Sequence, residues 1–248
     1  MRRVAGGLIG GAYRPSPTIR SVPDLGAKLA EEALAQRARL PRKPDPATLE
    51  GAIVRLVPLE VQRDVDELHA ASDGRPNSWG ERRADSYDPD ASIWRYMPAG
   101  PFRDSAELAG YLDGLVGARD ALCLCVTDPG SGQRLGVMNY QANFPEHLKI
   151  ELGGIWYSPV AQGTGANTEA AYLLLEHAFG LGYRRVEWKC DALNERSRRA
   201  AERLGFTFEG VQDSHYIVKG RNRDTAWFRI LEREWPAVRQ RLKGLLEA

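Results

Sequence analysis

The chain has 248 residues, of which 43% are hydrophobic and 27% are charged, and its formal net charge is +1. This composition is ordinary for a soluble globular protein, and the length allows one large domain or two small ones. No apolar run approaches the roughly 18 residues that a membrane-spanning helix needs, so we expect no membrane-spanning segment. The glycine-rich start is interrupted at Tyr13-Arg14-Pro15, which disfavours a signal peptide.

Cysteine and histidine are few and scattered. Cys123, Cys125 and Cys190 lie in strand-like apolar runs, which predicts reduced core residues of a cytoplasmic protein. Cys123-x-Cys125 lacks the spacing of a zinc knuckle, and no two histidines have the spacing of ligands on one helix. We therefore expect no metal site and a cytoplasmic location.

The N-terminal part differs in charge from the rest. Residues 1–45 hold nine basic and four acidic residues, whereas the remainder is mildly acidic. Residues 1–24 are rich in Gly, Pro, Ser and Arg, 25–40 has a short helical pattern, and Pro41 to Pro46 is typical of a linker. We predict a basic, partly disordered extension over 1–46 and a main domain over 47–248. A basic tail could contact RNA or acidic partners; the alternative is a solvated extension without a partner.

Hydrophobic patterns and turn signals define the elements of the main domain, and no internal repeat is present. In chain order they predict a strand at 53–59, a helix at 61–72, a helix at 104–119, a hairpin of 121–127 with 134–141, a strand at 149–157, a helix at 168–181, a strand at 185–190, a helix at 194–204, a short apolar stretch at 206–208, a strand at 225–231 and a helix from 234. This order predicts an α+β fold around a mostly antiparallel mixed sheet, flanked by helices, with a single strand–helix–strand crossover.

A long irregular segment, 73–103, interrupts this pattern with several aromatic residues. Such segments are uncommon in compact domains unless they cover something. The aromatic side chains at 79–102 could line a pocket or form a hydrophobic lid over the sheet, and the sequence favours neither.

The crossover passes through the loop Gln162-Gly163-Thr164-Gly165-Ala166-Asn167. Gly163 and Gly165 allow a ligand to approach the backbone closely. The helix that follows presents free N–H groups and the positive end of its dipole. A strand, a glycine loop and a helix in this order predict a phosphate-binding loop, although glycines can also serve only to bend the chain.

Several motifs in fixed order resemble the GNAT superfamily of N-acetyltransferases, and within it the branch of the RimJ and RimL protein acetyltransferases. They are Leu49-Glu50-Gly51, Val54-Arg55-Leu56, the loop 162–167, Glu187-Trp188-Lys189-Cys190, Asn194-x-x-Ser197, 198–206 and 219–225. The resemblance covers about residues 48–240. It implies the GNAT fold, with acetyl-CoA as the acyl donor and a primary amine as the acceptor.

The resemblance also implies site residues. The acyl-CoA would be bound by Ile155, Trp156, Tyr157, Gln162, Gly163, Thr164, Gly165, Ala166, Asn167, Thr168, Asn194 and Ser197. Gly153 and Gly154 would form a bulge whose backbone polarises the thioester carbonyl. Glu151 would be the general base, because an amine must lose a proton before it attacks; the alternative is a strand glutamate paired with a neighbouring Lys or Arg. Ser197 would be the side chain beside the leaving thiolate.

Some positions depart from the family or have alternatives. Asn167 stands where the family has Gly or Ala; it can cap the helix, but it leaves the donor open. Ala201 occupies the position of a common Tyr acid, which leaves Ser197, a water or the distant Tyr216. His147 is the second candidate base. Asp224 is interpreted as structural, bound to Arg221 or to a turn amide.

Three functions follow. The first is acetyl transfer from acetyl-CoA to a protein N-terminus or a small-molecule amine by direct attack. The second keeps the fold but takes an aminoacyl group from tRNA, for which the basic tail and Asn167 are the motivation. The third is a catalytically degenerate acyl-CoA-binding module. A homodimer is a further hypothesis.

Overall fold

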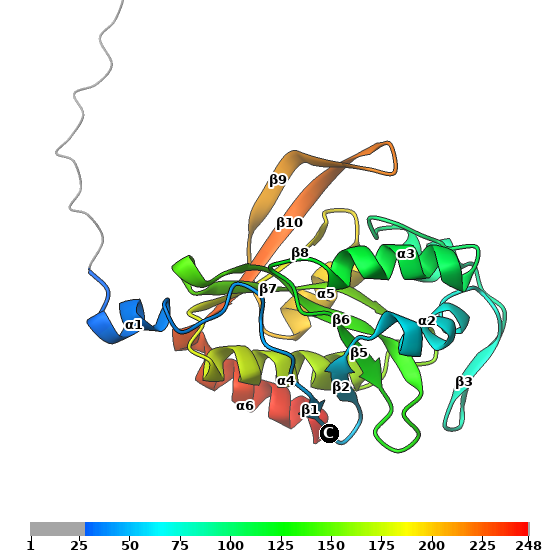
Figure 1. Cartoon of the computed structure of the whole chain (residues 1–248), viewed down its shortest axis with the longest axis horizontal. Coiled ribbons are helices and arrows are strands. Elements are labelled where there is room, and N and C mark those ends of the chain that lie inside the picture. Colours follow the sequence, from blue (N-terminus) through cyan, green and yellow to red (C-terminus); the bar gives the residue numbers. More distant parts are fainter. Residues whose placement is uncertain (1–27, 248) are drawn as a thin grey trace, which may run out of the picture.

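The computed structural model describes residues 28–247. They form an eight-stranded sheet, a separate two-stranded hairpin, and helices on both faces of the sheet (Figure 1). The strands are β1 (Leu49–Glu50), β2 (Arg55–Pro58), β3 (Asn77–Trp79), β4 (Arg82–Ala84), β5 (Leu124–Thr127), β6 (Arg134–Phe144), β7 (Lys149–Tyr157), β8 (Arg185–Asp191), β9 (Thr207–Val218) and β10 (Arg221–Leu231). The helices are α1 (Glu31–Gln36), α2 (Val61–Ala70), α3 (Ser105–Val116), α4 (Ala166–Gly180), α5 (Glu195–Arg203) and α6 (Trp235–Leu246), with shorter turns η1 (Asp90–Trp94), η2 (Pro145–His147) and η3 (Glu232–Glu234).

The large sheet has the strand order β1-β2-β5-β6-β7-β8-β10-β9. Its neighbouring strands are antiparallel except β7 and β8, which are parallel and joined by α4. A parallel pair requires a long crossover, whereas antiparallel neighbours need only a turn. The predicted α+β fold, with its mostly antiparallel mixed sheet and one crossover, is therefore confirmed.

Two hydrophobic cores lie on opposite faces of the sheet. On one face, Leu152 and Phe228 pack with Leu174 of α4. On the other face, Leu68 of α2 and Leu112 of α3 belong to a second cluster. Successive side chains on a strand point to opposite faces. Strands covered on both faces therefore have nearly continuous apolar runs, which explains why they were recognisable in the sequence.

β7 and β8 separate halfway along their length. Their parallel pairing ends at Leu152 and Trp188. Over the following residues, 153–156, β7 contains one residue more than β6, which is the bulge expected at the glycine pair. Gly154 has φ +60°, and a Cβ there would lie 2.5 Å from Asn139 Nδ2, so this position requires glycine. Beyond the break, the edge of β7 that faces β8 has no strand partner among residues 28–247.

The crossover helix α4 is fixed to the first strands by Glu169. Its buried carboxylate accepts hydrogen bonds from the backbone N–H groups of Ala52, Ile53 and Val54, at 3.0, 2.6 and 2.7 Å. A Cβ on Gly51 would clash with the same carboxylate, because it would lie 2.4 Å from Glu169 Oε2. The motif Leu49-Glu50-Gly51 thus serves to bring the chain close to the start of α4.

Part of the predicted N-terminal extension packs on the domain. α1 is shorter than the helix expected over 25–40. Leu40 belongs to the larger hydrophobic core, Gln36 Nε2 donates to Leu181 O at 2.6 Å, and Asn143 Nδ2 donates to Pro41 O at 2.9 Å. Residues 1–27, on which most of the predicted disorder falls, lie outside the described residues. The boundary at residue 46 stays a prediction.

The long hairpin of β9 and β10 differs from the prediction, which had only an apolar stretch at 206–208 and a strand at 225–231. β9 has exposed side chains along most of its length, so it lacks the alternation that identifies a half-buried strand. Lys219 and Gly220 both have positive φ, which is the geometry of a tight two-residue hairpin turn. The hairpin projects from the body of the molecule (Figure 1).

The segment 73–103 is not wholly irregular, because it contains the β3–β4 hairpin and the π-helix η1. Trp94 is fully buried, and its ring centroid lies 5.0 Å from that of Phe102 and 5.1 Å from that of Trp156. These aromatic residues pack over the sheet as a lid. Tyr96 and Met97, in contrast, reach the cavities described next.

Candidate active site

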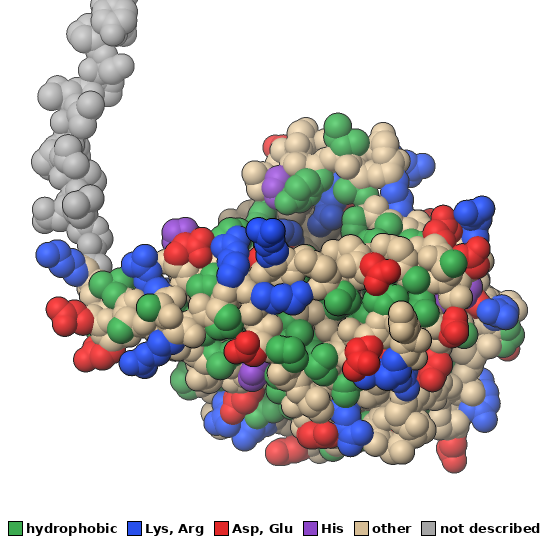
Figure 2. Space-filling view, in the orientation of Figure 1, with side chains coloured by type: hydrophobic (Ala, Val, Ile, Leu, Met, Phe, Trp, Pro, Cys, Tyr) green, Lys and Arg blue, Asp and Glu red, His purple; other side chains and the backbone are tan. Residues whose placement is uncertain are grey.

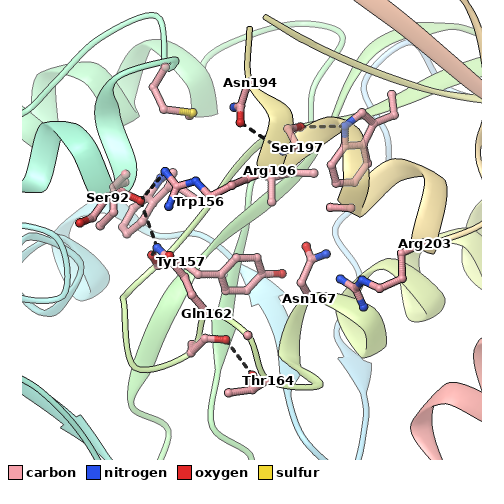
Figure 3. Close-up of a pocket in the computed structure, with 17 residues that line it drawn as sticks. Ser92, Trp156, Tyr157, Gln162, Thr164, Asn167, Asn194, Arg196, Ser197 and Arg203 are labelled. Atoms are coloured by element: carbon pink, nitrogen blue, oxygen red, sulfur yellow. Dashed lines mark hydrogen bonds between the residues drawn. The ribbon is translucent and has the colours of Figure 1, made fainter. Parts of the chain in front are cut away.

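A cavity of about 560 Å³ lies where β7 and β8 separate (Figure 3). The sequence-predicted residues that line it are Ile155, Trp156, Tyr157, Gln162, Gly163, Thr164, Asn167, Asn194 and Ser197. Gly165, Ala166 and Thr168 do not line it: Gly165 packs against Ile53, and the other two are buried. We call this space the larger cavity.

The start of α4 faces the larger cavity, and one of its first N–H groups, that of Ala166, donates to Thr164 Oγ1 at 3.1 Å. The helix begins at Ala166, two residues before the predicted start, and its N-cap is Gly165, which makes no side-chain hydrogen bond. The prediction that Asn167 could cap the helix was therefore wrong; this residue lies in the first turn and points to the cavity. Gly163 has φ +68° and no atom within 4 Å of a notional Cβ. The helix end and this open backbone suit an anion.

Arg203 and Arg196 also line the larger cavity and were missed from the sequence. Arg203 Nη1 donates to Thr168 Oγ1 at 2.6 Å, which places its positive charge beside the start of α4. Arg196, Ala200 and Arg203 are spaced by four and three residues, so they share one face of α5. This spacing, read together with the neighbouring glycine loop, was the available signal.

The segment 91–97 contributes three residues to the wall of the larger cavity and is held in place by polar side chains. Gln162 Nε2 donates to Ser92 O at 3.2 Å and to Tyr157 O at 2.9 Å, so its side chain orders the loop. Arg196 Nη2 donates to Ser92 O at 3.1 Å. From the turn of the β9–β10 hairpin, Lys219 Nζ donates to Trp94 O at 2.7 Å. Because these partners are far apart in sequence, no local motif could reveal this part of the wall.

The Tyr157 hydroxyl is buried and has no hydrogen-bond partner among the described residues. Burial raises the pKa of this phenol well above its usual value. In Figure 3 its oxygen points across the larger cavity toward Asn167. A buried hydroxyl without a partner is costly, so the site is suited to a ligand that supplies one.

Ser197 lies between the larger cavity and a second one, and its position is fixed by two contacts. Its backbone N–H donates to Asn194 Oδ1 at 3.1 Å, which caps α5. Trp188 Nε1 donates to Ser197 Oγ at 3.1 Å. Since that bond uses the oxygen as acceptor, the hydroxyl proton remains available to donate elsewhere. Asn194 therefore caps α5 and also forms part of the wall of the larger cavity.

The smaller cavity, of about 150 Å³, adjoins the larger one. Both are lined by Met97, Ile155, Trp188, Asn194 and Ser197. The smaller cavity also collects side chains from distant segments, including Tyr96, Tyr111, Gln141, Glu151, Lys189, Asp191 and Arg223. The two spaces thus meet at the strand break.

Glu151 is the buried acid of the smaller cavity, with its side chain 1% exposed. Its Oε1 accepts a hydrogen bond from Gln141 Nε2 at 2.6 Å, and its Oε2 lies 2.9 Å from Lys189 Nζ. Burial raises the pKa of Glu151, and the effect outweighs the opposing influence of Lys189 and Gln141. A carboxylate with a raised pKa in a cavity holds a proton more readily than an exposed glutamate does, which suits a general base.

Other candidates are placed elsewhere. His147 is exposed in η2 and lines neither cavity, and Tyr216 lies on β9 outside both linings. Asp224 Oδ1 accepts from Ser214 N at 2.7 Å and from Asn222 Nδ2 at 2.8 Å. The interpretation of Asp224 as structural is thus supported, but its partners lie on strands β9 and β10 at a register shift, and they are neither Arg221 nor a turn amide. The cysteines are free and buried.

Residues 28–247, the part of the chain that the structure describes, contain neither a membrane-spanning helix nor a cluster of metal-binding side chains. No helix in this range is long and apolar enough to cross a membrane. Within the same range, no cluster of three or more His, Cys, Asp or Glu side chains could hold a metal ion.

Comparisons with known proteins agree with this architecture. A family model described as an acetyltransferase (GNAT) domain matches residues 54–207. The structure of a GCN5-related N-acetyltransferase from Brucella melitensis is 40% identical, with a TM-score of 0.73 over 83% of this chain and 88% of that one. A probable acetyltransferase of the GNAT family from Chromobacterium violaceum is 34% identical, with a TM-score of 0.70 over 89% and 99%. The chain therefore belongs to the GNAT acetyltransferase family and is an acyltransferase.

A curated relative gives a finer comparison. "Putative ribosomal N-acetyltransferase YdaF" from Bacillus subtilis (strain 168) is 35% identical over 88 residues, 35% of this chain. The match spans about half of that relative, 48% of its length. Together with the family match, this similarity confirms the predicted resemblance to the GNAT N-acetyltransferases.

Proposed function

We propose that the protein transfers an acetyl group from acetyl-CoA to a primary amine by direct attack, without a covalent enzyme intermediate. The observation that carries this proposal is the meeting of two cavities at the break between β7 and β8. The larger cavity has a helix start whose N-cap residue is a glycine, and the smaller one has a buried carboxylate. An anionic donor and an amine acceptor would thus approach the same point from two sides.

The larger cavity fits acetyl-CoA by the chemistry of its walls. Gly163 and the start of α4 would receive phosphate groups, with Arg203 adding positive charge beside them. The Tyr157 hydroxyl, which lacks a partner, would gain one. When bound, acetyl-CoA supplies an acetyl thioester, which is an activated acyl group. Backbone N–H groups of residues 154–156, beside the strand break, would stabilise negative charge on an acyl oxygen.

The smaller cavity handles the proton of the acceptor. Glu151 Oε2 would accept a proton from the amine, so that nitrogen attacks in its neutral form. The pKa of Glu151 is raised, and therefore the carboxylate holds a transferred proton more readily than an exposed glutamate would. On the donor side, the Ser197 hydroxyl, oriented by Trp188, would direct its proton toward the leaving sulfur. Trp188 is a positioning residue in this scheme.

The acceptor belongs to one of two classes, a protein N-terminus or a small-molecule amine. The name of the relative from Bacillus subtilis refers to a ribosomal N-acetyltransferase. That similarity makes a polypeptide N-terminus the first acceptor to test for this protein. The cytoplasmic location, the homodimer and the RNA contact of the basic tail stay predictions.

A titration of acetyl-CoA, CoA and longer acyl-CoAs against the purified chain tests the donor. We expect acetyl-CoA to raise the unfolding temperature and to be consumed with a member of an amine panel. If acetyl-CoA leaves the unfolding temperature unchanged and no amine consumes it, the proposal fails. Loss of activity on ribonuclease treatment would instead support the aminoacyl-tRNA alternative. Tight binding without turnover on any amine would support a degenerate acyl-CoA-binding module.

A further inference from the structure

Arg223 of β10 lines the smaller cavity without an anionic partner. Its Nε is buried and makes no hydrogen bond to any described residue. No carboxylate of residues 28–247 lies within 4.0 Å of its guanidinium nitrogens. Its recorded contact is with the ring of Tyr216, whose centroid is 5.6 Å from Arg223 Cζ. A buried, unpaired guanidinium N–H is costly unless a ligand satisfies it.

The other charges of the smaller cavity are already engaged. Lys189 is paired with Glu151, at 2.9 Å. Asp191 Oδ1 accepts from the backbone N–H of Leu193 at 2.9 Å, which orders the turn after β8. Arg223 is therefore the charged lining residue for which the described chain provides neither an ion pair nor a hydrogen bond.

Lys189 of β8 and Arg223 both act on the His215 ring of the neighbouring hairpin, so two positive charges lie on this side of the smaller cavity. The His215 ring lies on the same hairpin, and its pKa is lowered, first by desolvation and then by the charges of Lys189 and Arg223. Lys189 Nζ also lies 5.2 Å from the ring centroid of Trp227. Figure 2 shows a hollow beneath the projecting hairpin with basic side chains visible in it. The wall of the smaller cavity formed by the hairpin therefore suits an anionic group.

We propose that the acceptor carries a carboxylate close to its reactive amine, and that Arg223 binds this carboxylate while the amine lies beside Glu151. A guanidinium group binds a carboxylate with two parallel N–H donors, which fixes orientation as well as distance. The proposal deepens the proposed function and rests on it. The same chemistry occurs in a free amino acid and in a peptide N-terminus followed by an acidic residue, and the experiment separates these two sources.

The test compares matched acceptors with and without the carboxylate. The free-acid pair is alanine and alaninamide; the peptide pair is Ala-Asp and Ala-Asn, both with amidated C-termini. For each we would measure kcat/KM with acetyl-CoA, and the Kd by calorimetry without acetyl-CoA. We expect at least about a tenfold preference for the carboxylate in one pair, the size of one charge-assisted hydrogen bond. The pair that shows it identifies the source.

Three variants connect the preference to Arg223. We expect Arg223→Gln to abolish it and Arg223→Lys to keep part of it, because lysine keeps the charge but loses the paired donors. Arg221→Gln is the matched control, since Arg221 is an exposed arginine on the same strand and lines neither cavity. It should keep the full preference.

The outcomes separate the two proposals. Equal kcat/KM and equal Kd for both members of each pair would overturn the carboxylate site while leaving acetyl transfer intact. A preference that survives in Arg223→Gln would also overturn it. If no amine is acetylated, the proposed function fails, and the calorimetric preference alone then decides whether Arg223 binds a carboxylate. Absence of binding by every member would reject the site.

Discussion

The two cavities at the strand break differ in how the chain builds them. Much of the larger cavity comes from one continuous stretch, Ile155 to Asn167, and from the face of α5. The smaller cavity collects residues from segments as distant as Tyr96 and Arg223. Backbone groups and a helix end dominate the first, and individual side chains dominate the second. Backbone geometry can bind a donor that all members of a family share. Selection of the acceptor then depends on individual side chains, which can change one at a time.

The largest expected effect concerns the smaller cavity. Glu151→Gln should reduce kcat by about 10²- to 10⁴-fold, the usual range for loss of a general base. In the unchanged protein kcat/KM should fall as the pH drops through the raised pKa of Glu151, because the base is then protonated. Lys189, Gln141 and Glu187 set that pKa together with burial. The variant should lose this limb of the pH profile.

Acetyl-CoA binding provides the control for Glu151→Gln. Because Glu151 lines only the smaller cavity, the Kd for acetyl-CoA should be unchanged. Glu146→Gln is a second control, because Glu146 is an exposed carboxylate outside both linings. A Glu151→Gln variant with an unaltered pH profile would remove Glu151 from the mechanism.

The next effect concerns the larger cavity. A valine at Gly163 would place a side chain in the open space beside the start of α4. We expect Gly163→Val to weaken acetyl-CoA binding by about tenfold or more, equivalent to about 1.4 kcal/mol. The measurement is calorimetric titration of acetyl-CoA.

Gly132→Val is the matched control for Gly163→Val. Gly132 also has positive φ and an open surrounding, but it lies in the loop between β5 and β6. Both variants should pay the same backbone penalty of about 1–2 kcal/mol in unfolding free energy. Equal acetyl-CoA affinity in the two variants would contradict the phosphate-binding role of the loop.

A smaller effect is expected where the cavities join. Trp188→Phe keeps an aromatic side chain but replaces the indole with a smaller ring and removes the N–H that orients Ser197 Oγ. We expect kcat to fall by about five- to tenfold, the size of one hydrogen bond, with little change in KM. In a Ser197→Ala background the same substitution should have almost no further effect, because the two residues act through one contact. If the two substitutions reduce kcat independently and additively, Trp188 only lines the cavity and does not act through Ser197.

The smallest effect is expected at Asn167. Since Gly165 is the N-cap, Asn167→Ala should leave the unfolding free energy unchanged or raise it by about 0.5 kcal/mol. Acetyl-CoA affinity should change by no more than about threefold, the cost of a weak exposed contact. Thermal unfolding with and without acetyl-CoA measures both. A large loss of affinity would mean that Asn167 is a specific donor contact.

The sequence predicted the parts of the fold that depend on local signals. Strands covered on both faces had continuous apolar runs, and the glycine pair at 153–154 predicted the bulge. β9 was missed because its exposed faces give no alternation. The start of α4 was misplaced because a glycine N-cap leaves no side-chain signal, and Asn167 offered a more conventional one.

For the site, the sequence by itself predicted the loop from its glycines and the helix after it, because these are local properties, and the resemblance to the GNAT family predicted the bulge and the carboxylate at position 151. The tertiary structure decided which groups face one another. It placed Arg203 beside α4, directed Trp188 to Ser197, and brought Arg223 from β10 to the cavity that contains Glu151. The residues in these contacts are not related by helical or strand periodicity. They come together because of the twist and separation of the strands, which no local sequence pattern shows.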